Sequence, residues 1–171
     1  MLRKYEYRRR LPHYQPDHKI FFITFCTHQR WKLPPSGRQI VVEVCRRGDG
    51  GLFVLLAMVV MPDHVHLALC PLSTPDGTFS IPETLQAIKG TSSHRINQQI
   101  GHQGRVWQQE SFDRALRREE QVEDKILYML ENPVRAGLVG NPVDYPWSWR
   151  KTEGWVKIRL QARSGESDVR E

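Results

Sequence analysis

Apolar residues along the chain follow two different periods, which predict strands and helices in alternation. Residues 19–27 (KIFFITFCT) are rich in β-branched and aromatic side chains and predict a strand. Residues 52–61 form an apolar run bounded by glycines and a proline, and the length of this run favours a buried strand over a helix. After a tight turn, residues 64–70 (HVHLALC) predict a second strand. We expect these last two strands to form a hairpin.

The segments between and after these strands carry helical signals. A stretch rich in proline leads into a helix expected over 37–47, and Pro82 at a first helical position, with Ser80 as its cap, predicts a second helix. A third helix is expected over 119–132, preceded by a short strand over 112–117. This order predicts an α+β sandwich with a mainly antiparallel sheet, for which a ferredoxin-like arrangement is the nearest named topology.

Length and composition indicate one domain with flanking segments. The chain has 171 residues, of which 39% are hydrophobic and 26% charged, so it can form a packed core. We expect a basic arm over 1–18, a domain over 19–140, and a tail over 141–171 whose last residues are disordered.

No apolar run approaches the roughly 20 residues of a membrane span. The charged N-terminal stretch is not followed by an apolar segment, so we expect no secretory signal there. The three cysteines are far apart in the sequence and are expected to be free thiols.

The basic charge is concentrated at one end of the chain. Residues 1–32 hold eight lysines and arginines against two acidic residues, so they account for the whole net charge of +6. Tyrosines are interleaved with these basic residues, among them Arg8, Arg9 and Arg10. Cations mixed with aromatic side chains suit nucleic acid, and single strands in particular. A solvated basic tail without a partner is the alternative.

A pair of histidines, His64 and His66, lies in the second strand of the predicted hairpin. Residues i and i+2 of a strand project from the same face, so both imidazoles reach one point while Val65 turns away. Two such ligands are half of a divalent metal site, with positions left for water, a third ligand and substrate. A purely structural role is the alternative reading of the pair.

The predicted helix over 119–132 places a tyrosine on its polar face. The apolar arc of this helix is made by Ile126, Leu127, Met129 and Leu130. Tyr128 points the opposite way, with Asn132 one turn later and Lys125 one turn earlier. We hypothesise that the two histidines and a third ligand from this helix hold Mg²⁺ or Mn²⁺, and that Tyr128 attacks a phosphate there. The product would be a phosphotyrosine ester.

Four strings carry a resemblance to a known family: VVMPDHVHLAL, IKGTSSHRIN, RVWQQESFDRALR and ILYMLENPVRAGLV, with DYPWSW after them. The chain resembles the REP-associated tyrosine transposases, which belong to the HUH single-tyrosine transposase superfamily. The resemblance runs from about Tyr14 to Trp149. It implies an HUH α/β sandwich with a ferredoxin-like sheet, and an endonuclease and strand transferase that cleaves single-stranded DNA near REP palindromes folded as hairpins.

Carried over to this chain, the resemblance implies specific roles. His64 and His66 match the metal ligands, and Tyr128 matches the nucleophile that forms a 5′-phosphotyrosine link and leaves a free 3′-hydroxyl. Asn132 falls where related transposases place a polar third ligand, and Glu131 is its competitor. The metal would be Mg²⁺ or Mn²⁺. A cytoplasmic, nucleoid-associated protein acting as a monomer rather than a dimer is expected, with no membrane partner.

Further basic residues are expected to contact DNA: Arg8, Arg9 and Arg10 in the arm, then Lys89, Arg114 and Arg135. An ion pair between Asp113 and Arg114 is the alternative for that position. Two other functions stay open from the sequence. One is a DNA-hairpin-binding protein whose nuclease has decayed, and the other is a metal phosphodiesterase that uses water in place of the tyrosine.

Overall fold

The computed structural model describes residues 19–74, 77–116 and 121–152, and the predicted arm over 1–18 lies outside this range. The strands are β1 (Phe21–Thr27), β2 (Phe53–Val60), β3 (His64–Pro71), β4 (Ser73–Thr74), β5 (Gly77–Thr78), β6 (Trp107–Ala115) and β7 (Ser148–Arg150). The helices are α1 (Pro35–Gly48), α2 (Ile81–Ile100), α3 (Val122–Leu130) and α4 (Asn132–Arg135), with short 3₁₀ turns η1 (His28–Arg30) and η2 (Pro142–Asp144).

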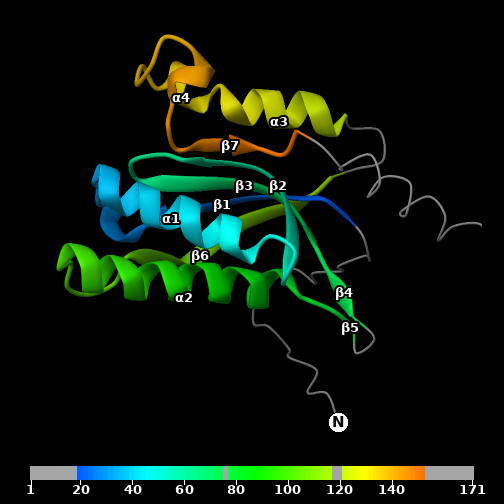
Figure 1. The fold of residues 1–171 in the computed structure, drawn as a ribbon, viewed down its shortest axis with the longest axis horizontal. Coiled ribbons are helices and arrows are strands. Elements are labelled where there is room, and N and C mark those ends of the chain that lie inside the picture. Colours follow the sequence, from blue (N-terminus) through cyan, green and yellow to red (C-terminus); the bar gives the residue numbers. More distant parts are fainter. Residues whose placement is uncertain (1–18, 75–76, 117–120, 153–171) are drawn as a thin grey trace, which may run out of the picture.

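One antiparallel sheet organises the molecule, with strand order β6-β1-β3-β2-β7. Its first four strands, connected through α1 and α2, have the order and directions of the ferredoxin-like topology. Figure 1 shows α1 and α2 on one face of the sheet and α3 on the other. The predicted α+β fold is therefore confirmed. β7, which pairs with the edge of β2, was not predicted.

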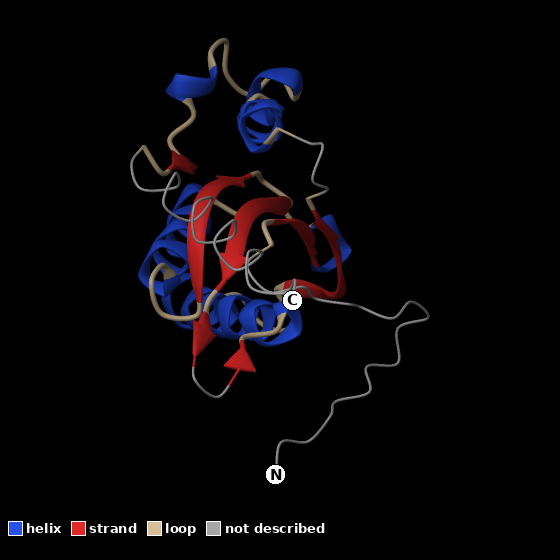
Figure 2. Ribbon diagram, turned by 90° about the vertical axis from the view of Figure 1, so that its right-hand side faces the viewer, coloured by secondary structure: helices blue, strands red, loops and turns tan. Residues whose placement is uncertain are grey.

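Both faces of the sheet are covered where β2 and β3 lie, which explains why these segments are apolar throughout. On one face Phe53 and Leu67 belong to a core shared with α1 and α2. On the other face Ile126 and Met129 of α3 pack onto Ala57 and its neighbours. Figure 2, turned by a quarter from the first view, shows the helices on opposite sides of the sheet. A strand buried on both faces has no polar positions to alternate with.

The helix boundaries follow their local chemistry. The predicted cap Ser80 is confirmed at the start of α2 and is part of a capping box: its side chain accepts from the Glu83 backbone N–H, and the Glu83 carboxylate accepts from the Ser80 backbone N–H. α2 continues unbroken through Gly90 to a left-handed Gly101. The helix predicted over 119–132 is divided: α3 ends at Leu130, and α4 begins at Asn132 with Pro133 in its first turn.

No helix in the described part of the chain is long and apolar enough to cross a membrane. The three cysteines are free. Residues after the predicted boundary at 140 add η2 and β7 to the fold, and Trp147 between them packs against the core on both sides of the sheet.

Candidate functional site

The two histidines lie at the beginning of β3, on the face of the sheet that carries α3. Val65 between them is fully buried in the opposite core, as the strand period predicts. The ring centroids of His64 and His66 are 4.8 Å apart, and the rings meet edge to face at 86°. Both side chains are half-buried, whereas Ala68 further along this face is buried beneath α3. The imidazoles are therefore less covered than the residues further along the strand.

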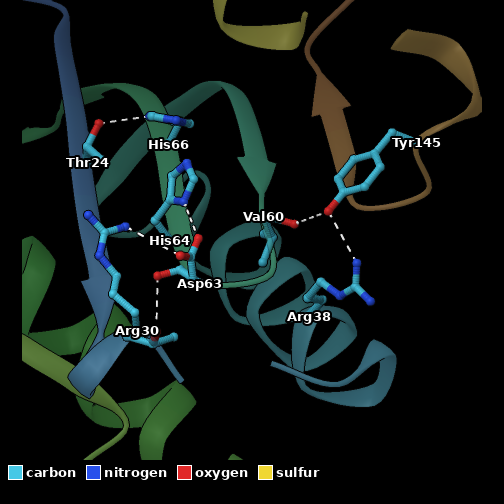
Figure 3. Close-up of polar contacts among 9 residues, drawn as sticks. Thr24, Arg30, Arg38, Val60, Asp63, His64, His66 and Tyr145 are labelled. Carbon is cyan, nitrogen blue, oxygen red and sulfur yellow. Dashed lines mark hydrogen bonds and ion pairs between the residues drawn. The ribbon is translucent and has the colours of Figure 1, made fainter. Parts of the chain in front are cut away.

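Each imidazole is held through its Nδ1 atom. The Nδ1–H of His64 donates to Asp63 Oδ1 at 2.6 Å, and His66 Nδ1 lies 2.8 Å from Thr24 Oγ1 (Figure 3). An ionised carboxylate can only accept, so it places the proton of neutral His64 on Nδ1 and leaves a lone pair on Nε2. Thr24 permits the same tautomer at His66. Metal-ligating histidines typically have their second nitrogen bound in this way.

The charges around the pair suit a neutral imidazole ligand. Burial, followed by the charges of His64 and Arg135, lowers the pKa of His66 to about 4. Partial burial raises the pKa of Asp63, but the hydrogen bond from His64 and nearby cations outweigh it and hold that pKa below its usual value. Arg30 is one of these cations, 3.6 Å from the carboxylate. At neutral pH His66 is uncharged and Asp63 is ionised.

The turn that carries Asp63 is fixed by the neighbouring strand and loop. Thr27 donates its backbone N–H and its hydroxyl to the Asp63 carbonyl at 2.9 and 3.0 Å. The Leu33 N–H donates to the Pro62 carbonyl at 2.7 Å. Gln29 and Arg30 have positive φ values of 52° and 55°, so the η1 turn bends sharply here. These bonds hold the Asp63–His64 segment against the sheet.

A pocket of about 240 Å³ brings one histidine together with the tyrosine helix. Its polar and charged lining residues are Thr24, His66, Arg114, Lys125, Tyr128 and Asn132. Tyr128 is 67% exposed, as expected for the polar face of α3. His66, Tyr128 and Asn132, three of the four residues that the sequence assigned to the metal and the nucleophile, therefore line one pocket. The fourth, His64, does not line it, but its ring packs against the ring of His66.

Arg135 connects the tyrosine with the predicted third ligand. Its guanidinium lies 4.0 Å from the Tyr128 ring centroid and donates to the Tyr128 carbonyl at 2.9 Å. It also donates to Asn132 Oδ1 at 2.8 Å, while the Asn132 amide donates to the Met129 carbonyl at 2.8 Å. Glu131, the competing ligand, is exposed, lies 4.0 Å from Arg135 and is not among the residues that line the pocket.

The remaining predicted DNA contacts fall in three places. Arg114 lines the pocket with Tyr128, whereas its neighbour Asp113 lines a separate cavity on the opposite face of the sheet. Lys89 belongs to that second cavity, where it donates to the Gln108 carbonyl at 3.0 Å and to Ser111 Oγ at 2.6 Å. Arg8, Arg9 and Arg10 lie outside the described residues. Their roles toward DNA stay predictions.

Two residues at the pocket were missed by the sequence reasoning. Thr24 supports His66, and it could be assigned only with the pairing of β1 and β3, which sets Thr24 directly opposite His66. Phe112 lines the pocket from β6 and is 68% exposed. Phe112 stands between the polar residues Ser111 and Asp113 of this strand. A large apolar residue in an otherwise polar stretch was a signal that the sequence reasoning could have used.

A divalent cation at this site would be bound by imidazole nitrogen atoms and by oxygen atoms. Across the described ranges, no three His, Cys, Asp or Glu side chains gather where they could hold a metal. A metal at His64 and His66 would therefore take its third protein ligand from another side chain, such as an amide oxygen. The oxygen ligands of such a site, an amide and water, are those that suit Mg²⁺ and Mn²⁺.

Comparison with known proteins assigns the class of this chain. The profile of the family described as "Transposase IS200 like" matches residues 15–120, which is more than half of the chain. The chain therefore belongs to the IS200-like transposase family. The matched stretch contains His64 and His66 and ends before Tyr128.

The similar proteins point to one group of these transposases. The REP-associated tyrosine transposase of Escherichia coli (strain K12) is 27% identical over 147 residues, which are 84% of this chain and 81% of that protein. A Haemophilus influenzae protein with a provisional form of the same name is 27% identical over 125 residues, 69% of this chain and 70% of its own. The resemblance to REP-associated tyrosine transposases found in the sequence is confirmed.

A solved structure supports the same grouping. It is described as a REP-associated tyrosine transposase bound to a REP hairpin, and it superposes with a TM-score of 0.61 at 26% identity. The similarity covers 84% of this chain and 81% of the other. The ferredoxin-like fold described above is thus the fold of this relative as well.

Proposed function

We propose that this protein is a metal-dependent endonuclease and strand transferase that acts on single-stranded DNA at REP-type hairpins through a 5′-phosphotyrosine intermediate. The observation that carries the proposal is the pocket shared by His66, Tyr128 and Asn132, with His64 in contact at its border. The family supports a DNA-cleaving transposase. The hairpin substrate is inferred from the relative whose structure contains a REP hairpin.

The reaction uses the exposed hydroxyl of Tyr128. Its oxygen attacks the scissile phosphorus, the bond from phosphorus to the 3′-oxygen breaks, and the 3′-oxygen takes a proton to leave as a hydroxyl. The proton of Tyr128 passes to solvent, which reaches a side chain that is 67% exposed. The ester formed on tyrosine keeps the phosphodiester bond energy, so a later 3′-hydroxyl can displace the tyrosine and rejoin DNA without ATP.

Mg²⁺ or Mn²⁺, when bound, would withdraw charge from the phosphate that is attacked. His64 and His66 would hold it through Nε2, and Asn132 is the third ligand we propose. Asn132 Oδ1 accepts from Arg135, and the second lone pair of this amide oxygen is available for ligation. Asp63 and Thr24 act on the ligands rather than on the substrate: Asp63 keeps the His64 proton on Nδ1, and Thr24 can accept the Nδ1 proton of His66.

The test is trapping of the covalent intermediate. Incubation of the protein with a labelled REP-type hairpin that has single-stranded flanks, in Mg²⁺ or Mn²⁺, should give an adduct that survives denaturing electrophoresis. Tyr128→Phe should abolish the adduct. Tyr145→Phe is the matched control, because the Tyr145 hydroxyl is buried against the Val60 carbonyl at 2.8 Å and lies outside this pocket.

The outcomes separate the possible functions. An adduct that persists in Tyr128→Phe would overturn the nucleophile. Metal-dependent cleavage by the native protein without any adduct would indicate attack by water. Tight hairpin binding without cleavage at any tested sequence would indicate a binding protein that has lost its nuclease activity.

A further inference from the structure

An exposed phenyl ring faces the pocket from the edge strand of the sheet. Phe112 of β6 is 68% exposed and pairs directly with Thr24 of β1. Thr24 in turn bonds His66, so Phe112 is two strands from the imidazole on the same face. Tyr128 lines the same pocket from the helix above.

Burial of a phenylalanine side chain stabilises a folded protein, and Phe112 forgoes most of this stabilisation because it is 68% exposed. The ring is flanked by cationic residues that line the pocket with it. Arg114 is two residues further along the same strand, and Lys125 is one turn before Tyr128 on α3. An apolar ring between cationic side chains is complementary to a nucleotide, which combines a stacking base with a phosphate.

We propose that Phe112 is a stacking platform for one unpaired nucleobase next to the phosphate attacked by Tyr128. This inference rests on the proposed function and adds the substrate feature that the pocket reads. Bases in a duplex already have both faces covered, so a ring in this position selects DNA whose flanking nucleotide is single-stranded. Stacking is tolerant of base identity, so Phe112 contributes to strand state and position more than to sequence.

Fluorescence of 2-aminopurine tests the stacking without depending on cleavage. The probe replaces each base in turn on both sides of the scissile phosphate, and binding is followed with Tyr128→Phe protein in Mg²⁺. We expect quenching at one position adjacent to that phosphate. The quenching should vanish when Phe112→Ala is added, and Phe112→Trp should restore it.

Affinity gives the second measurement. Phe112→Ala should weaken binding of the single-stranded flank about 5- to 150-fold, the range measured for loss of one base–aromatic stack. Because the ring is mostly exposed, this substitution should leave the melting temperature unchanged. Leu127→Ala is the matched control: Leu127 is apolar, 46% exposed, on α3 and not among the pocket-lining residues. It should bind as the parent protein does.

An abasic nucleotide at the quenched position completes the test. With that base removed, Phe112→Ala should have no further effect. An equal loss on the abasic and the intact strand, or no loss on either, would overturn the stacking role. These results differ from failure of the proposed function, in which the native protein forms no adduct although the base is quenched.

Discussion

The hydrogen bond from His64 to Asp63 gives the sharpest prediction about the metal site. Asp63→Asn keeps the shape of the side chain but replaces an acceptor-only carboxylate by an amide that can donate to Nδ1. His64 would then no longer be restricted to the Nδ1–H tautomer, and its proton could move to Nε2, the nitrogen we assign to the metal. The bond is short, 2.6 Å, and the Asp63 side chain is only 27% exposed, so solvent compensates little for its loss.

The magnitude follows from this outer-shell position. Loss of such a partner typically lowers metal affinity about 10- to 100-fold, or roughly 1.4–2.8 kcal/mol. Titration of Mn²⁺ by isothermal calorimetry at pH 7 measures it directly, and thermal unfolding in the absence of metal reports the cost to the fold. Asp144→Asn, an exposed position on η2, is the control with the same change in charge.

We expect a 10- to 100-fold rise in the dissociation constant for Asp63→Asn and no change for Asp144→Asn. Native affinity in Asp63→Asn would refute the tautomer argument. An equal loss in Asp144→Asn would show that net charge, rather than the hydrogen bond, controls binding.

Two further predictions concern Arg135 and His66. Arg135→Lys should slow adduct formation about tenfold while DNA affinity changes less, because one ammonium cannot both stack on Tyr128 and bond Asn132 as the guanidinium does. An unchanged single-turnover rate with weaker, less salt-dependent binding would instead assign Arg135 to a phosphate. In the absence of metal, the pKa of His66 is about 4 in the folded protein and 6.5 in the unfolded chain. Between pH 7 and pH 5 the unfolded chain therefore takes up a proton at this residue and the folded protein does not, which favours unfolding. The free energy of unfolding should fall by about 2 kcal/mol from pH 7 to pH 5, and His66→Gln should remove that component. An NMR titration of His66 near pH 6.5 would contradict it.

The sequence was sufficient for the features that depend on local period. Alternation places His64 and His66 on one face and Val65 on the other, and the helical period exposes Tyr128 on the polar side of α3. The apolar segment over 52–61 indicated a buried strand through its length rather than its period, because a continuous apolar run has no polar position to face solvent.

Features that depend on pairing between distant segments could not be predicted. Thr24 supports His66 only because β1 and β3 pair in the observed register. β6 begins at Trp107, whereas a strand was expected only from 112. Residues 108–110 are all polar and show no strand alternation, so nothing in the sequence indicated this first part. In this part of β6 its pairing with β1 changes register. The ammonium of Lys89, which lies on α2, binds the Gln108 carbonyl and Ser111 here, and this contact between distant segments could not be read from the sequence.

Diffraction from a complex of Tyr128→Phe protein with Mn²⁺ and an uncleaved hairpin tests the convergence of these groups most directly. We expect an anomalous manganese peak about 2.1 Å from Nε2 of His64 and of His66, as for a divalent metal bound by imidazole. We also expect the scissile phosphate between this peak and the ring of residue 128. Manganese bound elsewhere, or a phosphate beyond reach of that ring, would contradict it.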